Sequence, residues 1–347
     1  MGGDKALVGW VMGTFTISTV ITRPFMACWI ERRGERQVIF SGLFIIFVAS
    51  LGYHLHSSLN IFVYGNRILH GLGFSAFVAG TFTLLGRLAP LKRRGEIFSI
   101  SGAFILFAMA MGPFCGEFIV KERGFSGLFN VASACTFLSI IVVYFFKGEE
   151  REYIPENKRV PFSEILHNKS FLWVLLSTLF FVLGQSTILN FLPLYFHQKD
   201  TASGLYFLQA APLAIIIRLF GGKFIDVFGK VRLIRLSFVL FGIGSLLIPF
   251  WEKGNIFLLS PFLYGLGLAY LYPAHNALVA DQARSEKDMP AIFSIFSGIF
   301  DAAFIGGTIL AGLLAEKFGF DMVFYLIAIT SFAGAILQFV VNIHEEK

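Results

Sequence analysis

The chain alternates between long apolar segments and short polar ones. Eleven apolar runs of about 20 residues each can be counted along its 347 residues. A helix of about 20 residues spans the roughly 30 Å hydrocarbon core of a bilayer, so each run predicts a membrane-spanning helix and the fold class is all-α integral membrane. The predicted spans are 6–30, 38–55, 59–85, 97–120, 128–146, 171–196, 202–225, 233–250, 256–279, 290–314 and 322–341.

The composition supports a protein embedded in a lipid bilayer. Hydrophobic residues make up 56% of the chain and charged residues 14%, which is more apolar surface than a soluble domain of this size can bury. The basic residues behind the net charge of +6 lie in short loops between apolar runs. They therefore indicate which side of the membrane these loops face, and they predict no nucleic-acid partner. The cysteines Cys28, Cys115 and Cys135 have no C-x-x-C spacing and predict neither a disulfide framework nor a metal site.

One long polar segment divides the spans into two groups. Residues 147–170 carry mixed charge and separate five spans from six. We expect an N-terminal bundle at 1–146, a linker at 147–170 with a short amphipathic helix near 161–167, and a C-terminal bundle at 171–347. On the side of the membrane that holds the linker, Lys and Arg are about three times as frequent as on the opposite side. This bias places the linker and the C-terminus of a multi-pass protein in the cytoplasm.

Two charged turns recur at a spacing of 195 residues. At this offset Arg23 pairs with Arg218, and the same offset relates many other positions along the chain. Further pairs are Gly9 with Gly204, Glu31 with Asp226, Gly34 with Gly229, Gly112 with Gly307 and Gly124 with Gly319, while Gly71 and Gly73 match Gly265 and Gly267 with a slip of one. Two homologous halves with the same orientation are therefore predicted. Such duplication is typical of secondary transporters.

The turns and two further motifs resemble signatures of the major facilitator superfamily. The loop signature G-x-x-x-D-R-x-G-R-R is matched at Ala27, Glu31, Arg32, Gly34, Glu35 and Arg36, and again at Gly222, Asp226, Gly229 and Lys230. The helix 4 signature R-x-x-x-G-x-G-x-x-A is matched at Arg67, Gly71, Gly73 and Ala76, and the helix 5 signature G-P-x-x-G at Gly112, Pro113 and Gly116. The chain departs from these signatures at four positions: Ala27 replaces a glycine, Glu31 an aspartate, Glu35 a basic residue and Glu117 a glycine.

The resemblance implies a fold of two homologous helical bundles with twelve helices in all. Within the superfamily the chain is most similar to bacterial sugar-efflux and drug-efflux permeases. Subtracting the repeat offset from 171–196 places the partner of that span before Met1. We therefore expect 5 + 6 spans with the first helix of the usual twelve missing, because of a late start site or a shortened chain.

For the two turns, the resemblance implies a conformational latch, meaning contacts that form in one transport state and break in the other. Its members would be Glu31, Arg32, Gly34, Arg36, Gly222, Asp226, Gly229 and Lys230. Gly222 would let the chain approach a neighbouring helix, and Asp226 could then face the positive N-terminus of a helix from the other bundle. The alternative is that these residues only end the helices and anchor the topology.

Asp301 lies in the middle of the span 290–314. A carboxylate there costs about 2.5–3.5 kcal/mol to insert, so it should face the bundle interior. We expect Asp301 to take up and release a proton, with Arg67 as a second charged group within the membrane. The alternatives are a buried acid held by a polar neighbour and an arginine that extends to the interface.

Other polar residues within spans are candidates for the solute cavity. These are Gln185, Asn190, His70 and Asn276. Hydrogen bonds between helices are the alternative role for the polar pair on 171–196, and packing is the alternative for His70 and for His275 beside Asn276. Gly112, Pro113 and Gly116 predict a kinked, smooth helix face for packing.

The interpretation that follows is a secondary active transporter in the inner membrane. It would move a small organic solute, sugar- or drug-like, outward by alternating access and in exchange for protons, as a monomer. No phosphate-binding G-x-x-x-x-G-K-[ST] motif is present, and no cofactor is expected. A transporter-like sensor or degenerate pseudo-transporter is the first alternative. A multi-span membrane enzyme is the second, although the chain offers no cluster of His, Asp or Cys at one interface.

Overall fold

A computed structural model describes residues 5–55, 60–146, 162–199, 203–251 and 253–345. The described residues form helices and turns and contain no strand, which confirms the all-α prediction. Short 3₁₀ turns lie at Tyr53–Leu55, Leu91–Arg93, Ile248–Phe250 and Glu286–Asp288. The α-helices are α1 (Lys5–Arg33), α2 (Glu35–Gly52), α3 (Ile61–Leu88), α4 (Arg94–Phe145), α5 (Phe162–Leu166), α6 (Lys169–Gln198), α7 (Ser203–Phe220), α8 (Lys223–Phe228), α9 (Lys230–Leu246), α10 (Ile256–Asp281), α11 (Met289–Phe318) and α12 (Phe320–Glu345).

The helices coincide with the apolar runs of the sequence. Within the described residues, seven helical segments are long and apolar enough to cross a membrane. They are Glu35–Leu55, Ile61–Leu88, Cys115–Phe145, Lys169–Gln198, Ile256–Asp281, Glu286–Phe318 and Phe320–Phe339. The other four runs, in α1, the first half of α4, α7 and α9, are helical as well. Membrane crossing by these four stays a prediction.

Two helix boundaries differ from the expected spans. The runs 97–120 and 128–146 both lie in α4, in which two helical segments meet at a kink at Gly124 (φ 67°). Glycine tolerates this positive φ, so a sharp bend there needs no separate loop. The run 202–225 is divided instead, because α7 ends at Phe220 and α8 begins at Lys223.

The chain divides into two compact units. Unit 1 comprises Met1–Leu88, Met111–Phe162 and Ala283–Asp301, and unit 2 comprises Ala89–Ala110, Ser163–Gln282 and Ala302–Lys347. Each unit therefore contains segments from both halves of the sequence. The predicted division into bundles at 1–146 and 171–347 remains a prediction. Most of the predicted linker, 147–161, lies outside the described residues, and α5 forms near the expected short helix.

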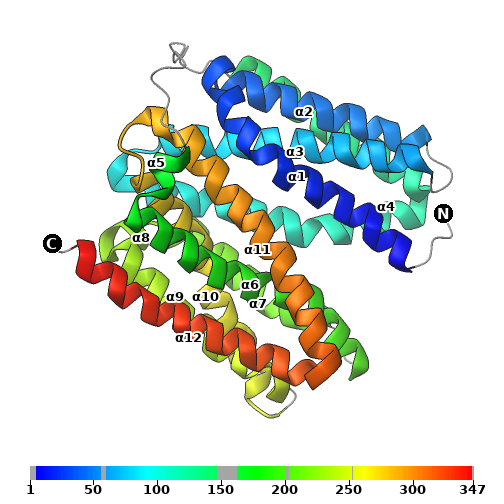
Figure 1. Ribbon diagram of the computed structural model, residues 1–347. Helices are drawn as coiled ribbons and strands as arrows, with labels where there is room; N and C mark the ends of the chain where they lie inside the picture. The colour runs from blue at the N-terminus through cyan, green and yellow to red at the C-terminus, as the bar shows by residue number, and fades with distance from the viewer. Residues whose placement is uncertain (1–4, 56–59, 147–161, 200–202, 252, 346–347) are drawn as a thin grey trace. The chain divides into compact units, whose positions relative to one another are not determined.

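In unit 1, α3 packs against both α1 and α2, and the three helices run side by side (Figure 1). A buried cluster forms where they meet. It consists of Met26, Ile30, Val38, Ala76 and Ala79, with Trp29 and Leu72 packed against it. The small residues on α3 permit a close approach of the helices, as is usual in membrane proteins.

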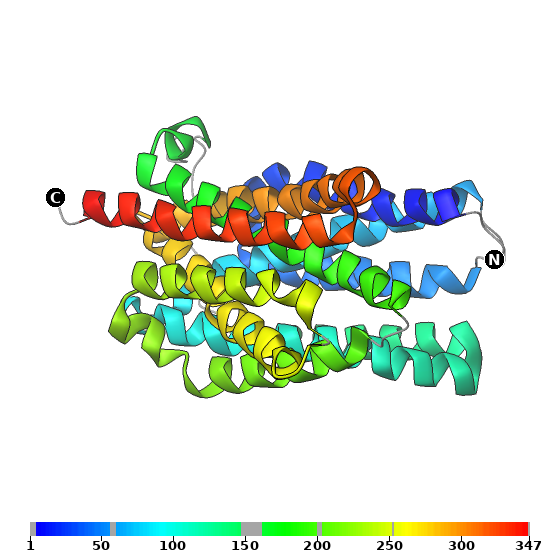
Figure 2. The same ribbon diagram turned by 90° about the horizontal axis from the view of Figure 1, so that it is seen from below.

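In unit 2, α10 packs against α7 and α9, and α12 packs against α6 and α9 (Figure 2). Aromatic side chains fill one end of this unit. Trp251 lies 4.7 Å from Phe196 and 4.8 Å from Phe257 between ring centroids, and its indole N–H donates to the Phe257 carbonyl oxygen at 2.8 Å. Such amphipathic rings bury apolar area while keeping their polar atoms hydrogen-bonded.

The predicted repeat is visible in equivalent backbone contacts within the two units. A methyl group at Gly71 would lie 2.6 Å from the Phe15 carbonyl oxygen, and one at Gly265 would lie 2.7 Å from that of Ala210. Gly71 on α3 and Gly265 on α10 are 194 residues apart, and Phe15 on α1 and Ala210 on α7 are 195 residues apart. Only glycine permits so close an approach of two helices. The packing therefore reproduces the one-residue shift of the repeat that the sequence shows on α3.

Two more contacts obey the same register. A methyl group at Gly73 would lie 2.8 Å from the Gly42 carbonyl oxygen, and one at Gly267 would lie 2.7 Å from that of Ser237. The Asn66 side chain donates to the Ala49 carbonyl oxygen at 3.0 Å, and Ser260 donates to that of Gly244 at 2.8 Å. The positive φ angles also repeat, at Gly34 (77°) and Gly229 (88°) and at Gly124 (67°) and Gly319 (83°). The two sequence halves therefore fold in the same local way.

Candidate functional site

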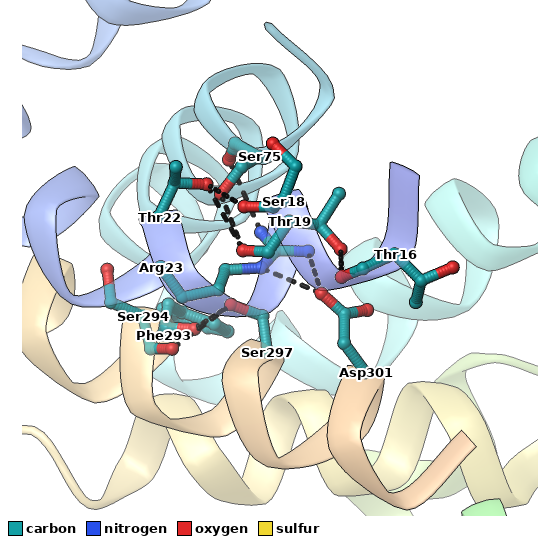
Figure 3. Close-up of polar contacts among 10 residues, drawn as sticks. All are labelled: Thr16, Ser18, Thr19, Thr22, Arg23, Ser75, Phe293, Ser294, Ser297 and Asp301. Carbon is teal, nitrogen blue, oxygen red and sulfur yellow. Dashed lines mark hydrogen bonds and ion pairs between the residues drawn. The ribbon is translucent and has the colours of Figure 1, made fainter. Parts of the chain in front are cut away.

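A buried ion pair in unit 1 joins α1 to α11. The Nη2 atom of Arg23 lies 2.8 Å from Asp301 Oδ2, and the Arg23 Nε atom donates to the same oxygen at 3.0 Å (Figure 3). The Arg23 side chain is 2% exposed and that of Asp301 19% exposed. Arg23 also donates from Nη1 to the Ser75 carbonyl oxygen on α3 at 3.3 Å. This arginine therefore joins its own helix, α1, to two others, α3 and α11.

The surroundings of the pair are small and polar. Gly298, one turn before Asp301 on α11, leaves space in which the Arg23 side chain lies, 3.6 Å from where a Cβ would be. The Ser75 hydroxyl donates to the Thr19 carbonyl oxygen at 3.4 Å, and the Ser297 hydroxyl to that of Phe293 at 2.7 Å (Figure 3). In a region of low dielectric constant, each charge of a salt bridge is favourable only while its partner is also charged. A proton that binds Asp301 would remove the negative charge and leave Arg23 as a buried cation.

Arg218 in unit 2 occupies the repeat position of Arg23 but lies among carbonyl groups. It donates from Nε to Ala269, from Nη2 to Leu268 and from Nη1 to Gly102, at 3.0, 2.8 and 2.8 Å. The contact with Ala269 on α10 is the repeat equivalent of the contact between Arg23 and Ser75 on α3. Asp301 corresponds at the same offset to Leu106 on α4, which has no charge. The arginine is therefore duplicated, whereas its carboxylate partner belongs to unit 1.

The side chain of Asp226 lies at the N-terminus of α4. Its Oδ1 accepts from the backbone N–H of Gly95 at 2.9 Å, and its Oδ2 accepts from that of Glu96 at 3.0 Å. The first N–H groups of a helix have no partner within the helix and carry partial positive charge, so a carboxylate is favourable there. Gly222 makes this approach possible, because a methyl group there would lie 2.6 Å from Ser99 Cβ on α4.

Ion pairs extend from Asp226 across the same end of unit 2. Lys230, the first residue of α9, lies 3.9 Å from Asp226 Oδ1 and 2.8 Å from Oδ2 of Asp281, which ends α10. Arg94 Nη1 contacts Oδ1 of the same Asp281 at 2.9 Å and donates to the Ala280 carbonyl oxygen at 2.9 Å. Asp281 therefore binds two cations, from α4 and from α9.

The turn between α1 and α2 in unit 1 is also held by charges. Glu35 is the first residue of α2, and its Oε2 atom lies 3.6 Å from Nη2 of Arg87 near the end of α3. Both side chains are buried. Arg36 donates to the carbonyl oxygens of Val143 and Tyr144 near the end of α4. Glu31 is buried at the end of α1, beside the exposed Arg32, and Gly34 makes the turn.

Comparison with known proteins identifies the family to which this architecture belongs. The sequence profile of the Major Facilitator Superfamily matches residues 1–217 and 198–347, which together cover the whole chain. The chain belongs to the Major Facilitator Superfamily. It is therefore a multi-pass membrane protein of a transporter family, as the loop and helix motifs of the sequence predicted.

The similar sequences include a multidrug resistance protein, an efflux pump and an amine transporter. Multidrug resistance protein 2 of Bacillus subtilis (strain 168) is 24% identical over 324 residues, which cover 86% of this chain and 79% of that protein. The multi-drug resistance efflux pump PmrA of Streptococcus pneumoniae is 24% identical, covering 91% of this chain and 81% of that one. The human synaptic vesicular amine transporter is 24% identical over 97% of this chain and 66% of its own length.

Solved superfamily structures have the same fold. The human organic anion transporter MFSD10 superposes with a TM-score of 0.80 at 17% identity, covering 95% of this chain and 83% of that one. A variant of the Escherichia coli fucose:proton symporter FucP gives a TM-score of 0.81 at 13% identity, covering 97% and 91%. At these identities the likeness shows the fold alone.

The two charged residues predicted within the membrane, Asp301 and Arg67, have different neighbours. Arg67 lies over the ring of Tyr53, 5.2 Å from its centroid, and the Tyr53 hydroxyl lies 3.1 Å from Nδ1 of His70. Arg67, Tyr53 and His70 thus form a group of their own within unit 1, while Asp301 pairs with Arg23. The partner of Asp301 was not predicted from the sequence.

The four residues predicted to line a solute cavity are distributed over both units. His70 belongs to unit 1, whereas Gln185, Asn190 and Asn276 belong to unit 2. Gln185 accepts from the Tyr264 hydroxyl at 3.2 Å, and Asn190 donates to Thr308 at 3.0 Å and to the Ser186 carbonyl oxygen at 2.8 Å. The contacts with Tyr264 on α10 and Thr308 on α11 join helices, which is the alternative role that the sequence left open. The solute role of all four stays a prediction.

The helix 5 motif lies within α4 without interrupting it. Helix α4 continues through Gly112, Pro113 and Gly116, and its non-helical dihedral angles are at Gly124 instead. A methyl group at Gly112 would have no neighbour within 4 Å, and one at Gly116 would lie 3.7 Å from Leu128. The bend at Gly124 lies between the two predicted spans 97–120 and 128–146, and the kink expected at Gly112, Pro113 and Gly116 stays a prediction.

Three functional candidates were missed from the sequence, namely Arg23, Arg94 and Asp281. Arg23 was noticed only as one member of the repeat, although an arginine within an apolar run is itself a signal. Arg94 and Asp281 lie at helix ends, where charged residues are common and carry little information. Their pairing across 187 residues appears only in three dimensions.

Proposed function

We propose that the protein is a secondary transporter that exports a small organic solute in exchange for protons by alternating access. The buried pair of Arg23 and Asp301 carries this proposal. It is a carboxylate that can bind a proton, held by a cation from another helix, within apolar segments. The similarity to a multidrug resistance protein and to a multi-drug resistance efflux pump supports the solute class and the outward direction.

In the proposed cycle, Asp301 is ionised in the state in which it contacts Arg23 and holds α1 against α11. Proton uptake neutralises Asp301 and weakens this contact, so that the two helices can separate. Proton release on the other side of the membrane restores the pair. A buried ion pair is well suited to this task, because loss of one charge makes the other unfavourable.

The turn contacts would act as the conformational latch in the same cycle. Asp226 at the N-terminus of α4 favours the arrangement in which α8 and α4 are in contact. Lys230, Arg94 and Asp281 stabilise it further. In this proposal the two bundles move about the linker as a monomer in the inner membrane, with the linker and the C-terminus in the cytoplasm. His70, Gln185, Asn190 and Asn276 remain the proposed solute contacts.

Replacing Asp301 with asparagine is expected to abolish accumulation driven by a pH gradient while exchange of solute for solute continues. Asparagine keeps the size and one acceptor oxygen but cannot carry the proton. The measurement is uptake into proteoliposomes of ethidium, a fluorescent cation, and fluorescein, a fluorescent anion, with and without an imposed gradient.

The matched control is Glu316→Gln, which removes an exposed carboxylate from the same helix. It should leave both activities unchanged. Accumulation that persists at the wild-type level in Asp301→Asn would remove this residue from the coupling mechanism. Vesicles whose wild-type protein binds a probe without accumulating or exchanging it would favour the sensor alternative.

A further inference from the structure

Two ion pairs occupy equivalent positions in the repeat but have opposite polarity. Glu35 begins α2 and pairs with Arg87 near the end of α3, at 3.6 Å. Lys230 begins α9 and pairs with Asp281 at the end of α10, at 2.8 Å. Glu35 corresponds to Lys230 at the offset of 195 residues, and Arg87 corresponds to Asp281 at the offset of 194.

These two offsets are the ones that the glycine contacts establish independently. The pairs Gly71–Phe15 and Gly265–Ala210 have the same two offsets. The correspondence of the ion pairs therefore follows from the packing of the helices, whatever charges the side chains carry. We propose that Glu35 and Arg87 are positioning residues for transport, a polarity-inverted counterpart of Lys230 and Asp281 that holds the α1–α2 turn against the end of α3 by charge attraction.

Helix dipoles explain why this polarity suits unit 1. An acid is favourable at a helix N-terminus and a base at a C-terminus, and Glu35 and Arg87 satisfy both preferences. Lys230 and Asp281 violate both. In unit 2 the violation is compensated, because Lys230 lies near Asp226 and Asp281 binds Arg94 as a second cation. The acid at position 35, where the superfamily motif has a base, is therefore a complementary choice.

The two pairs should respond differently when their charges are exchanged. In unit 1, Glu35→Lys or Arg87→Glu alone would bring two like charges together in a buried place. The combined variant Glu35→Lys/Arg87→Glu restores attraction between the two positions and reverses the helix-dipole preference. In unit 2, exchange should not help, since a lysine at position 281 would face Arg94 and an acid at position 230 would face Asp226.

The test measures local opening of the turn separately from transport. Val38 is fully buried on the first turn of α2, so a Val38→Cys reporter, with Cys28, Cys115 and Cys135 replaced by serine, becomes reactive when α2 leaves α3. Each single reversal in unit 1 should raise the rate of alkylation by a maleimide about tenfold or more. The combined variant should return this rate to within about threefold of the parent, since attraction is restored and the helix-dipole preference that is reversed is a weaker effect.

Ethidium transport in proteoliposomes should follow the same order, and only this arm rests on the proposed function. The exchange Lys230→Glu/Asp281→Lys should stay as impaired as its worse single variant. A combined unit 1 variant that remains as reactive as its worse single variant would overturn the proposal. So would a single Glu35→Lys variant whose reporter reacts at the parental rate. If the wild-type protein transports neither probe, the labelling result still decides the role of the pair.

Discussion

Asp226→Asn is expected to abolish most transport while the protein still reaches the membrane. The carboxylate accepts two backbone N–H groups at the N-terminus of α4 and lies near Lys230. Asparagine can keep one acceptor contact but loses the charge that the helix terminus and the lysine favour. At about 2 kcal/mol for such a partly buried arrangement, the equilibrium constant for forming the contacted state falls by roughly 30-fold.

The measurement is initial transport rate against the amount of protein in the membrane. Asp321→Asn is the matched control, because this exposed acid also lies in the first turn of a helix, α12. It should transport at the wild-type rate. If Asp226→Asn lost membrane protein in proportion to activity, the residue would serve folding or topology only, and the latch would have to be abandoned. Asp226→Glu, which keeps the charge on a longer side chain, should fall between the two.

Local signals in the sequence predicted much of this fold. The apolar runs predicted the helices, because an uninterrupted apolar segment in lipid must satisfy its backbone internally. Gly34 and Gly229, which pair in the repeat, both have a positive φ angle, a conformation that favours glycine. The position of Asp226 at a helix N-terminus was also anticipated, since an acid in a short turn between helices has few other favourable partners.

Contacts between distant segments could not be predicted in the same way. Arg23 and Asp301 are 278 residues apart, and no periodicity within a single helix points from one to the other. The same holds for Arg94 with Asp281 and for Glu35 with Arg87. The repeat offers a partial remedy, because a contact known in one half proposes its equivalent in the other. It fails for Asp301, whose equivalent position is Leu106.

The bend of α4 at Gly124 could be inferred from the repeat. The kink expected at Gly112, Pro113 and Gly116 stays a prediction, because α4 is helical through these residues and a proline bends a helix without ending it. Gly124 carries its own signal in the repeat, since it pairs with Gly319, which also has a positive φ and separates α11 from α12.

Arg23→Gln is expected to be more damaging than Asp301→Asn, and the two together less damaging than Arg23→Gln alone. Removing the cation leaves a buried carboxylate without its partner, at a cost of about 3–5 kcal/mol, whereas removing both charges leaves a neutral polar pair. Thermal unfolding in detergent should therefore show a low melting temperature for Arg23→Gln and recovery toward wild type in the double variant.

Recovery of folding should not bring recovery of function. Accumulation driven by a pH gradient should stay absent in the double variant, because no group remains to carry the proton. Arg218→Gln is the matched comparison at the equivalent repeat position, where the partners are the carbonyl oxygens of Gly102, Leu268 and Ala269. Adding Asp301→Asn to Arg218→Gln should recover nothing, since no carboxylate lies among those partners. Recovery of melting temperature in that combination, or proton-driven accumulation in the Arg23→Gln/Asp301→Asn variant, would show that the Arg23–Asp301 pair is not the coupling element.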